Sequence, residues 1–170
     1  MNTDQILPEE PDSELPEETA ADYHVSLLKD TVGALLGVDF GDKRTGLAIC
    51  DASRFLATGI GTISPGGIDR TAEAIAEEAK KRGVSGIVLG YPKNMDGSEG
   101  FRSKRALKLA RFLRAQTALP IALVDERMST MNAARFLNET NTRGAKRKAV
   151  IDTLSAEIIL QNAIDRLKHL

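Results

Sequence analysis

The 170-residue chain is predicted to fold as an α/β protein with a mixed five-stranded sheet and helices on both faces. Three observations support this prediction. The first part of the folded region holds three short apolar segments separated by turn residues, a pattern typical of an antiparallel meander. The later part alternates apolar strands with helical periodicity, which favours parallel strands joined by helices. The length suits one domain with a substantial core.

The antiparallel part is expected from three strands at about 34–40, 45–50 and 57–63. Glycines at 41 and 46 bracket the first turn, and the second strand follows at once. The sequence Ser64-Pro65-Gly66-Gly67 ends the meander. A helix is then expected over 68–82, because apolar positions recur at helical spacing and Gly83 can cap its end.

The later elements alternate in type. A continuous apolar run at 85–90 predicts a strand covered on both faces, and a loop rich in turn residues follows it. A helix to about residue 116 carries Lys104, Lys108 and Arg111 on one stripe. After a fifth strand at 121–124 the sequence predicts a short helix to about 138, a basic loop over 141–148 and a last helix over 147–168.

Charge divides the chain into two parts. Residues 1–30 hold nine acidic residues and one basic residue, with several prolines and few apolar side chains. Such a segment buries too little surface to offset its ordering entropy, so residues 1–31 are predicted to be a disordered acidic extension and 32–170 a single domain. Residues 31–170 hold 22 basic and 15 acidic residues. A basic domain is compatible with nucleic acid, although solvation alone explains both charges equally well.

Composition excludes some classes of protein. No apolar run approaches the roughly 20 residues needed to span a bilayer. The acidic N-terminus has no apolar core of the kind found in a secretory signal. The single cysteine, Cys50, excludes an internal disulfide framework and fits a reducing compartment. The expected location is the cytoplasm, with no membrane partner.

Three carboxylates stand at the ends of predicted elements. Asp39 ends the first strand, Glu126 follows the fifth strand, and Asp152 lies early in the last helix. The helix face of Asp152 also carries small residues, Ser155, Ala156 and Ala163, which allow a helix to approach a sheet closely. Because sites in open α/β sheets form outside the carboxyl ends of the strands, the three acids would converge there if the first and fifth strands are near neighbours.

Converging carboxylates need cations, and oxygen ligands suit Mg²⁺ or Mn²⁺. Two such ions about 4 Å apart can activate a water and stabilise the leaving oxygen of a phosphodiester. The alternatives for Asp39 are a phosphate-bearing ligand with its metal, or a structural hydrogen bond. For each acid taken singly, a turn or helix-cap role is the more common one.

Four blocks of the sequence resemble the YqgF/RuvX family, over about residues 33–168. The blocks are Gly37-Val38-Asp39-Phe40-Gly41-x-Lys43-Arg44-x-Gly46, Gly90-x-Pro92-x-Asn94-Met95-Asp96-Gly97, Val124-Asp125-Glu126-Arg127-x-Ser129-Thr130, and Lys148-x-x-x-Asp152-x-x-Ser155-Ala156. The resemblance implies an RNase H-like fold and a nuclease that processes the 5′ end of precursor 16S ribosomal RNA, or one that resolves Holliday junctions. Tyr91 stands where the family commonly has leucine.

The resemblance also implies that Asp39, Glu126 and Asp152 are the catalytic and metal-binding residues. Arg44, Asn94, Arg127 and Lys148 are the candidate substrate-binding residues, although the arginines could instead neutralise the acids and Asn94 could serve its turn. The expected cofactor is a pair of Mg²⁺ or Mn²⁺ ions. The expected partner is structured RNA, with branched DNA as the alternative, bound by a monomer or a weak homodimer.

Two other hypotheses remain open at this point. The chain could be a nucleic-acid-binding factor for ribosome assembly in which the acids are structural. It could also bind nucleotides through the turn after Asp39, which resembles the first phosphate loop of actin-like ATPases. Those proteins need a second domain of similar size, which this chain is too short to supply.

Overall fold

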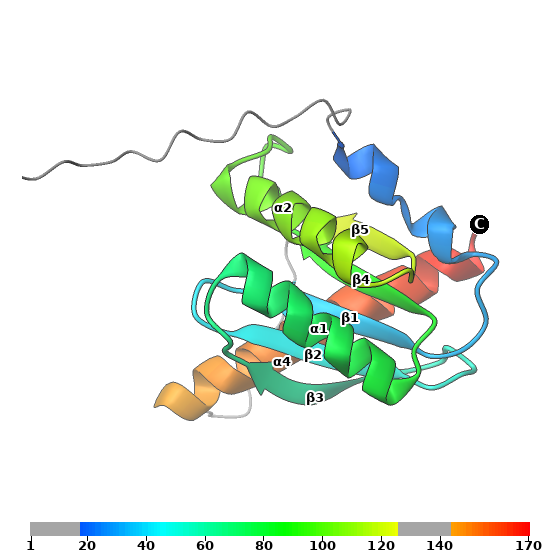
Figure 1. Cartoon of the computed structure of the whole chain (residues 1–170), viewed down its shortest axis with the longest axis horizontal. Helices are drawn as coiled ribbons and strands as arrows, with labels where there is room; N and C mark the ends of the chain where they lie inside the picture. The colour runs from blue at the N-terminus through cyan, green and yellow to red at the C-terminus, as the bar shows by residue number, and fades with distance from the viewer. Residues whose placement is uncertain (1–17, 126–143) are drawn as a thin grey trace, which may run out of the picture.

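A five-stranded sheet in the order β3-β2-β1-β4-β5 organises the protein (Figure 1). The computed structural model describes the backbone of residues 18–125 and 144–170, and the side chains of 18–125 and 151–170. Among these residues, no helix is both long and apolar enough to cross a membrane. The elements are η1 Ala20–Tyr23, η2 Val25–Leu28, β1 Leu35–Phe40, β2 Thr45–Cys50, β3 Ala57–Ile63, α1 Ile68–Arg82, β4 Gly86–Tyr91, α2 Phe101–Gln116, β5 Ile121–Asp125 and α4 Gly144–Lys168.

The strand directions confirm the predicted mixed sheet. β1 pairs antiparallel with β2, and β2 with β3, while β4 lies parallel to both β1 and β5. The β1–β2 turn closes where the Gly41 N–H donates to the Arg44 carbonyl at 3.0 Å. A side chain on Gly41 would put its Cβ 2.4 Å from that carbonyl oxygen, so only glycine fits this turn.

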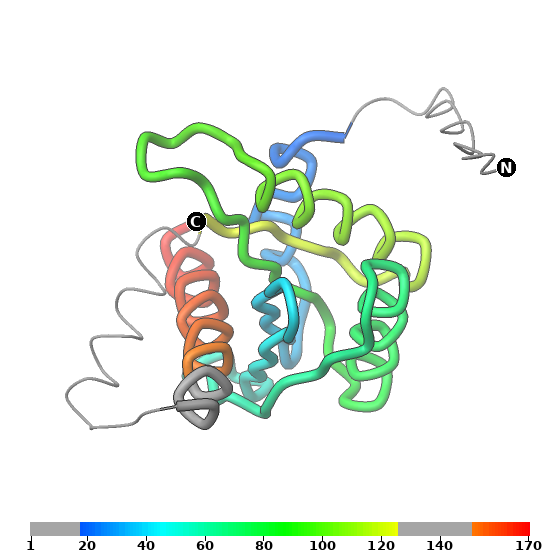
Figure 2. The backbone as a smooth tube through the Cα atoms, turned by 90° about the vertical axis from the view of Figure 1, so that its left-hand side faces the viewer, coloured from blue at the N-terminus to red at the C-terminus, as the bar shows by residue number. Residues whose placement is uncertain are grey.

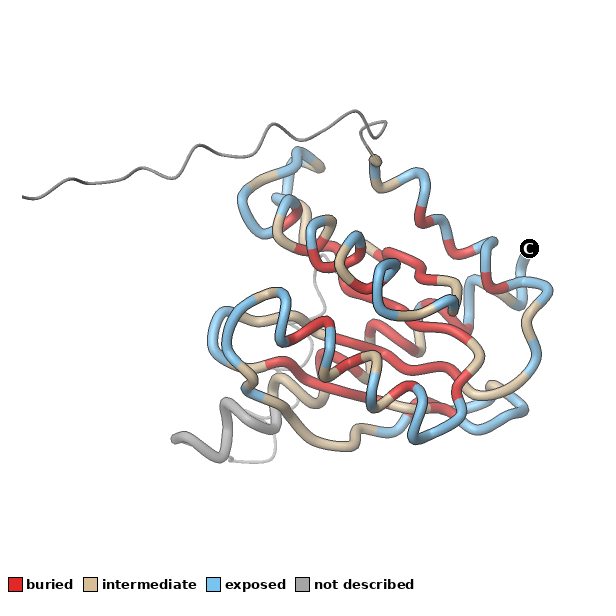
Figure 3. Tube along the Cα trace, viewed as in Figure 1, coloured by how far each residue is buried: buried red, intermediate tan, exposed pale blue. Residues whose placement is uncertain are grey.

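Helices cover both faces of the sheet, as the sequence predicts (Figure 2). Because side chains alternate along a strand, Leu36 and Val38 join the core under α1 and α2, while Leu35 joins the core under α4. The strands between these layers are mostly buried (Figure 3). This alternation also directs Asp39, which follows Leu35 and Gly37 on the same side of β1, towards the α4 face.

The end of α1 follows its sequence signal, whereas the start of α4 does not. α1 ends at Gly83, whose φ of 62° is left-handed and suits glycine. α4 begins at Gly144 and not near residue 147, so part of the predicted basic loop is helical. The predicted short helix before residue 138 lies outside the described residues.

Order begins earlier in the chain than the predicted boundary near residue 31. Two 3₁₀ turns, η1 and η2, precede β1, and they bury Tyr23, Val25 and Leu28 (Figure 3). The Leu28 side chain packs so closely on β4 that a Cβ on Gly86 would be 2.5 Å from its Cδ2. Disorder is therefore the wrong prediction for residues 20–28, because these few apolar side chains find places in the core that the local composition does not reveal.

Candidate active site

Asp39 lies near the end of the central strand, at the edge of the sheet where the parallel strands β1, β4 and β5 also end. The strand is fully buried up to Val38, and Asp39 is the first residue with partial exposure. Across the β1–β2 pair it stands opposite Gly46, which offers no side chain to cover it. Asp39 therefore follows buried apolar residues in its strand, and no side chain covers it from the position opposite in β2.

Helix α4 brings Asp152 to the same place, and glycines in the sheet make this approach possible. A Cβ on Gly46 would be 2.1 Å from the Asp152 carbonyl oxygen, and one on Gly59 would be 2.1 Å from Thr153 Cγ2. A Cβ on Gly37 would be 2.6 Å from Leu160 Cβ. Since real Cβ atoms do not approach so closely, the helix can lie here only over glycines.

The helix contributes a small-residue face to this contact. Ser155, Ala156 and Ala163 are buried against the sheet, as the sequence predicts from their spacing. Ile159, a large residue on the same helix face, is also fully buried. Close packing of a small-residue helix face on glycine positions thus fixes where the Asp152 backbone sits relative to Asp39.

The charge of Asp152 acts on Asp39. Burial, and next the negative charge of Asp152, raise the pKa of Asp39 to about 7, while the nearby Arg102 opposes this rise. Burial also raises the pKa of Asp152, and Arg44 counteracts it. The raised pKa of Asp39 means that two negative charges here repel each other. A bound cation would offset this repulsion and stabilise both carboxylates.

Arg44, a predicted substrate-binding residue, is an ion-pair partner of Asp152. Its Nε donates to Asp152 Oδ2 at 3.0 Å, and both side chains are partly exposed. The contact joins the β1–β2 turn to α4. Neutralising Asp152, which the sequence left as an alternative role, is thus the interaction seen in the structure, and a role towards substrate stays a prediction.

Two arginines that the sequence prediction missed lie at this edge of the sheet. Arg102 and Arg105, at the start of α2, pair with Asp42 in the β1–β2 turn at 3.3 and 2.6 Å. The Arg105 guanidinium also lies 4.7 Å from the centre of the Phe40 ring. The signal for them was the composition of α2, which is rich in basic residues and contains no acid.

The other predicted site residues are not brought to Asp39 by any described contact. The Asn94 side chain donates to Ser98 Oγ at 3.0 Å within its own loop, in keeping with the turn role. Glu126 and Arg127 lie outside the described residues, and Lys148 lies in α4 where side chains are not described. β5 ends at Asp125, which is in register with Tyr91 of β4.

The donor chemistry of the pair fits a hard divalent cation. Asp39 and Asp152 offer carboxylate oxygens only, which Mg²⁺ and Mn²⁺ prefer. Within the described ranges, no group of three His, Cys, Asp or Glu side chains is placed to hold a metal ion. The structure therefore brings two of the three predicted acids together, and the place of Glu126 as a third ligand stays a prediction.

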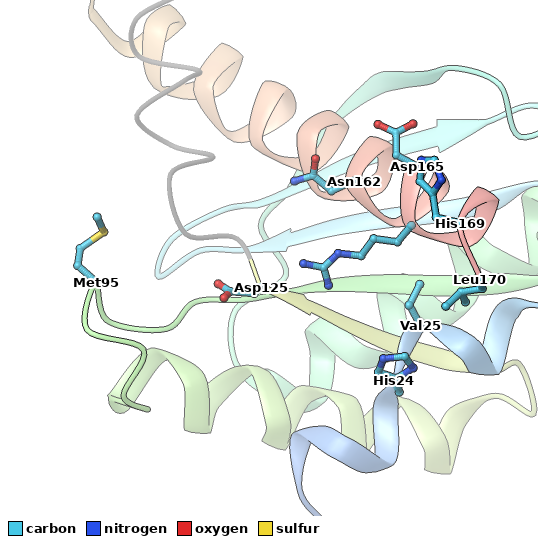
Figure 4. Close-up of a pocket in the computed structure, with 9 residues that line it drawn as sticks. His24, Val25, Met95, Asp125, Asn162, Asp165, His169 and Leu170 are labelled. Carbon is cyan, nitrogen blue, oxygen red and sulfur yellow. The ribbon is translucent and has the colours of Figure 1, made fainter.

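A hollow of about 960 Å³ lies elsewhere on the described surface (Figure 4). Asp125 and Asp165 line it together with Arg166, His24 and His169. Asp39 and Asp152 do not line this hollow, so it is separate from the candidate site between β1 and α4.

Known proteins are similar to this chain over most of its length. The sequence model of the family described as "RuvX: Holliday junction resolvase" matches residues 33–166. Curated relatives bear the name "Putative pre-16S rRNA nuclease". The one from Ruegeria sp. (strain TM1040) is 42% identical over 81% of this chain and 87% of its own length. The one from Bradyrhizobium sp. (strain ORS 278) is 46% identical over 81% of this chain and 86% of its own length.

A solved structure shares the fold. RuvC of T. thermophilus, determined in complex with a Holliday junction substrate, superposes with a TM-score of 0.51. The match covers 80% of this chain and 96% of that one, at 11% sequence identity. At this identity the likeness concerns architecture only, and it agrees with the RNase H-like mixed sheet that the sequence resemblance implies.

Proposed function

The chain belongs to the RuvX family, and from this we propose that it is a metal-dependent nuclease that hydrolyses phosphodiester bonds in the precursor of 16S ribosomal RNA. The observation that carries the proposal is the pairing of Asp39 with Asp152 at the end of β1. The names of its relatives supply the substrate, and such a substrate would place the protein in the cytoplasm.

In this proposal Asp39, Asp152 and Glu126 hold one or two Mg²⁺ or Mn²⁺ ions. Such ions lower the pKa of a bound water and stabilise the leaving oxygen of a phosphodiester. The carboxylates must be ionised to act as ligands. Arg44 favours the ionised form of Asp152 and fixes its direction, while the positive charge of Arg102 favours the ionised form of Asp39.

The basic residues beside the acids account for substrate attraction. Arg102 is largely exposed at the same edge, where it can meet a phosphate. Arg127 and Lys148 join it as predicted phosphate contacts, and Asn94 as a polar contact from the neighbouring loop. Positive side chains that surround a carboxylate pair draw in a polyanion and leave the acids to the cations.

A cleavage assay tests the proposal. Precursor 16S RNA with its 5′ extension is incubated with the protein and Mn²⁺ or Mg²⁺, and products are mapped on a sequencing gel. We expect wild type to cut and Asp39→Asn and Asp152→Asn to lose cleavage while keeping RNA affinity. Asp165→Asn, at the exposed far end of α4, is the matched control and should cut normally. Equal cleavage by all four proteins would indicate a contaminating nuclease and reject the proposal.

Junction DNA is the second candidate substrate, because the family model carries the description of a Holliday junction resolvase. A four-way DNA junction in the same assay tests it. Resolution requires paired cuts and therefore two active sites, whereas RNA trimming requires one. Binding of RNA without cleavage of either substrate would instead support the assembly-factor hypothesis.

A further inference from the structure

Helix α2 concentrates positive charge as no neighbouring helix does. Its sequence, FRSKRALKLARFLRAQ, contains six basic residues and no acidic one. The adjacent helix α1, with IDRTAEAIAEEAKKR, has four acidic and four basic residues. The two helices pack side by side on the same face of the sheet (Figure 1). Solubility alone would be served by balanced charges like those of α1, so the one-sign charge of α2 calls for a partner.

Ion pairs offset only part of the positive charge near each end of α2. Asp42 pairs with Arg102 and Arg105 at the start of the helix. Glu18 pairs with Arg114 at 2.8 Å and approaches Arg111 at 3.8 Å at the other end. Each of the two acids thus faces two arginines, which leaves a net positive charge at both ends.

Lys104 lies in the same turn of α2 as Arg102 and Arg105, and Lys108 lies between that turn and Arg111. Both lysines are exposed, and neither has an ion-pair partner among the described residues. They are four residues apart, so they stand on one face with a separation of about 6 Å along the axis. Two unpaired ammonium groups on an outward helix face offer consecutive contacts to a chain of phosphates.

The helix also leads to the candidate active site. Asp42 belongs to the turn that directly follows β1, so its pairs with Arg102 and Arg105 place the start of α2 beside the end of the strand that carries Asp39. Arg102 is close enough to Asp39 to affect its charge. A polyanion held along α2 would therefore reach the carboxylates at the edge of the sheet.

We propose that the outer face of α2, with Lys104 and Lys108 at its centre, binds the phosphate backbone of the RNA on one side of the cut, while Arg102 at the start of the helix lies on the side of the β1–β2 turn. This inference rests on the proposed nuclease function, since it assigns the surface that presents the substrate to that site. The contacts are to phosphates, so the surface positions the RNA without reading its sequence.

The test measures RNA binding without cleavage. Fluorescence anisotropy of a labelled precursor-RNA stem in EDTA gives the affinity at several salt concentrations. We expect Lys104→Gln/Lys108→Gln to lower the slope of log affinity against log salt by about 2, one unit for each lost phosphate contact. Affinity at 0.1 M salt should fall about tenfold, the size of one to two weakened phosphate contacts. With Mn²⁺ present, KM for cleavage should rise while kcat stays the same.

Lys80→Gln/Lys81→Gln on α1 is the matched control, because it removes the same charge from exposed positions of the adjacent helix. It should leave the salt slope unchanged. Equal slopes for wild type and the α2 variant, or equal losses in both variants, would overturn the inference. A stronger lysine-dependent affinity for junction DNA than for the RNA stem would overturn RNA as the partner.

The two proposals fail in different ways. If the protein binds RNA through Lys104 and Lys108 but cuts nothing with Mn²⁺, the proposed nuclease function is refuted and the proposed RNA-binding surface stands. A protein that cuts RNA but has the same slope in every variant refutes the surface and keeps the nuclease.

Discussion

Gly46 of β2 lies directly against the backbone of Asp152 in α4, so closely that a Cβ on Gly46 would be 2.1 Å from the Asp152 carbonyl oxygen. The same glycine stands opposite Asp39 in the β1–β2 pair. One residue without a side chain therefore allows both carboxylates to share the edge of the sheet. Packing and the candidate chemistry depend on the same contact.

The substitution Gly46→Ala should disturb both the packing of α4 and the candidate active site. The added methyl meets main-chain atoms that cannot rotate away, so α4 must shift, at a cost of about 1–3 kcal/mol in unfolding free energy. Cleavage should fall further than stability, because Asp152 moves with the helix. Chemical denaturation and RNA cleavage measure the two effects. Gly100→Ala is the control, since its nearest neighbour is the movable Asn94 side chain at 3.3 Å. Wild-type stability and activity in Gly46→Ala would contradict this account of the packing.

Asp39 should make the cation-free protein less stable as pH rises. Its pKa is about 7 in the folded protein and 3.8 ordinarily. Between these values the folded state holds a proton that the unfolded chain has lost. The unfolding free energy therefore falls as pH rises through this window and levels off above it. The fall should be roughly 2 to 4 kcal/mol.

Denaturation in EDTA at several pH values tests this prediction. Asp39→Asn cannot ionise, so its stability should show a much smaller fall and exceed that of wild type at pH 8. Excess Mn²⁺ should restore stability to wild type at that pH and leave the variant unchanged. If the unfolding free energies of the two proteins changed in parallel with pH, the pKa of Asp39 would not be raised in the folded protein.

Loss of Arg44 should change the pH dependence of cleavage. Without the guanidinium beside it, the pKa of Asp152 rises further, because burial is then unopposed. A carboxylate must be ionised to bind a cation, so the acid limb of the pH–rate profile should move to higher pH in Arg44→Ala. Arg82→Ala, which removes the surface pair with Glu78 on α1, should leave the profile in place. If the acid limb of Arg44→Ala did not move, Arg44 would not be the residue that lowers the pKa of Asp152.

The N-terminal turns should contribute to stability through Leu28. It is fully buried, whereas its neighbour Leu27 is 44% exposed. Leu28→Ala should lower the unfolding free energy by about 2–5 kcal/mol, and Leu27→Ala by less than about 0.5 kcal/mol. Thermal and urea denaturation compare the two. Equal, small effects would mean that η2 does not belong to the folded domain.

The sequence predicts most of the fold because its signals are local. β2, β3 and α1 have the predicted bounds, since turn glycines, apolar runs and the Gly83 cap all lie within the elements or next to them. The approach of Asp152 to the sheet is also predictable, from the small residues on its helix face. The close contacts with Gly46 and Gly59 are not, because they depend on how α4 crosses the strands.

Two features depend on long-range packing and cannot be predicted from the sequence. Tyr23 and Leu28 stand in an acidic, polar stretch, and only the finished core reveals the places that they fill. Arg102 and Arg105 reach the site because α2 starts beside the β1–β2 turn and pairs with Asp42. Composition could have singled out α2 as a charged helix, but not the end of it that meets Asp39.

Calorimetric titration with Mn²⁺ tests the central claim most directly, namely that Asp39 and Asp152 form one cation site. We predict that wild type and the Asp165→Asn control bind Mn²⁺ with the same affinity. Asp39→Asn and Asp152→Asn should each lose most of that affinity, because either substitution removes a ligand oxygen with its charge. Undiminished Mn²⁺ binding in both of these variants would contradict the account.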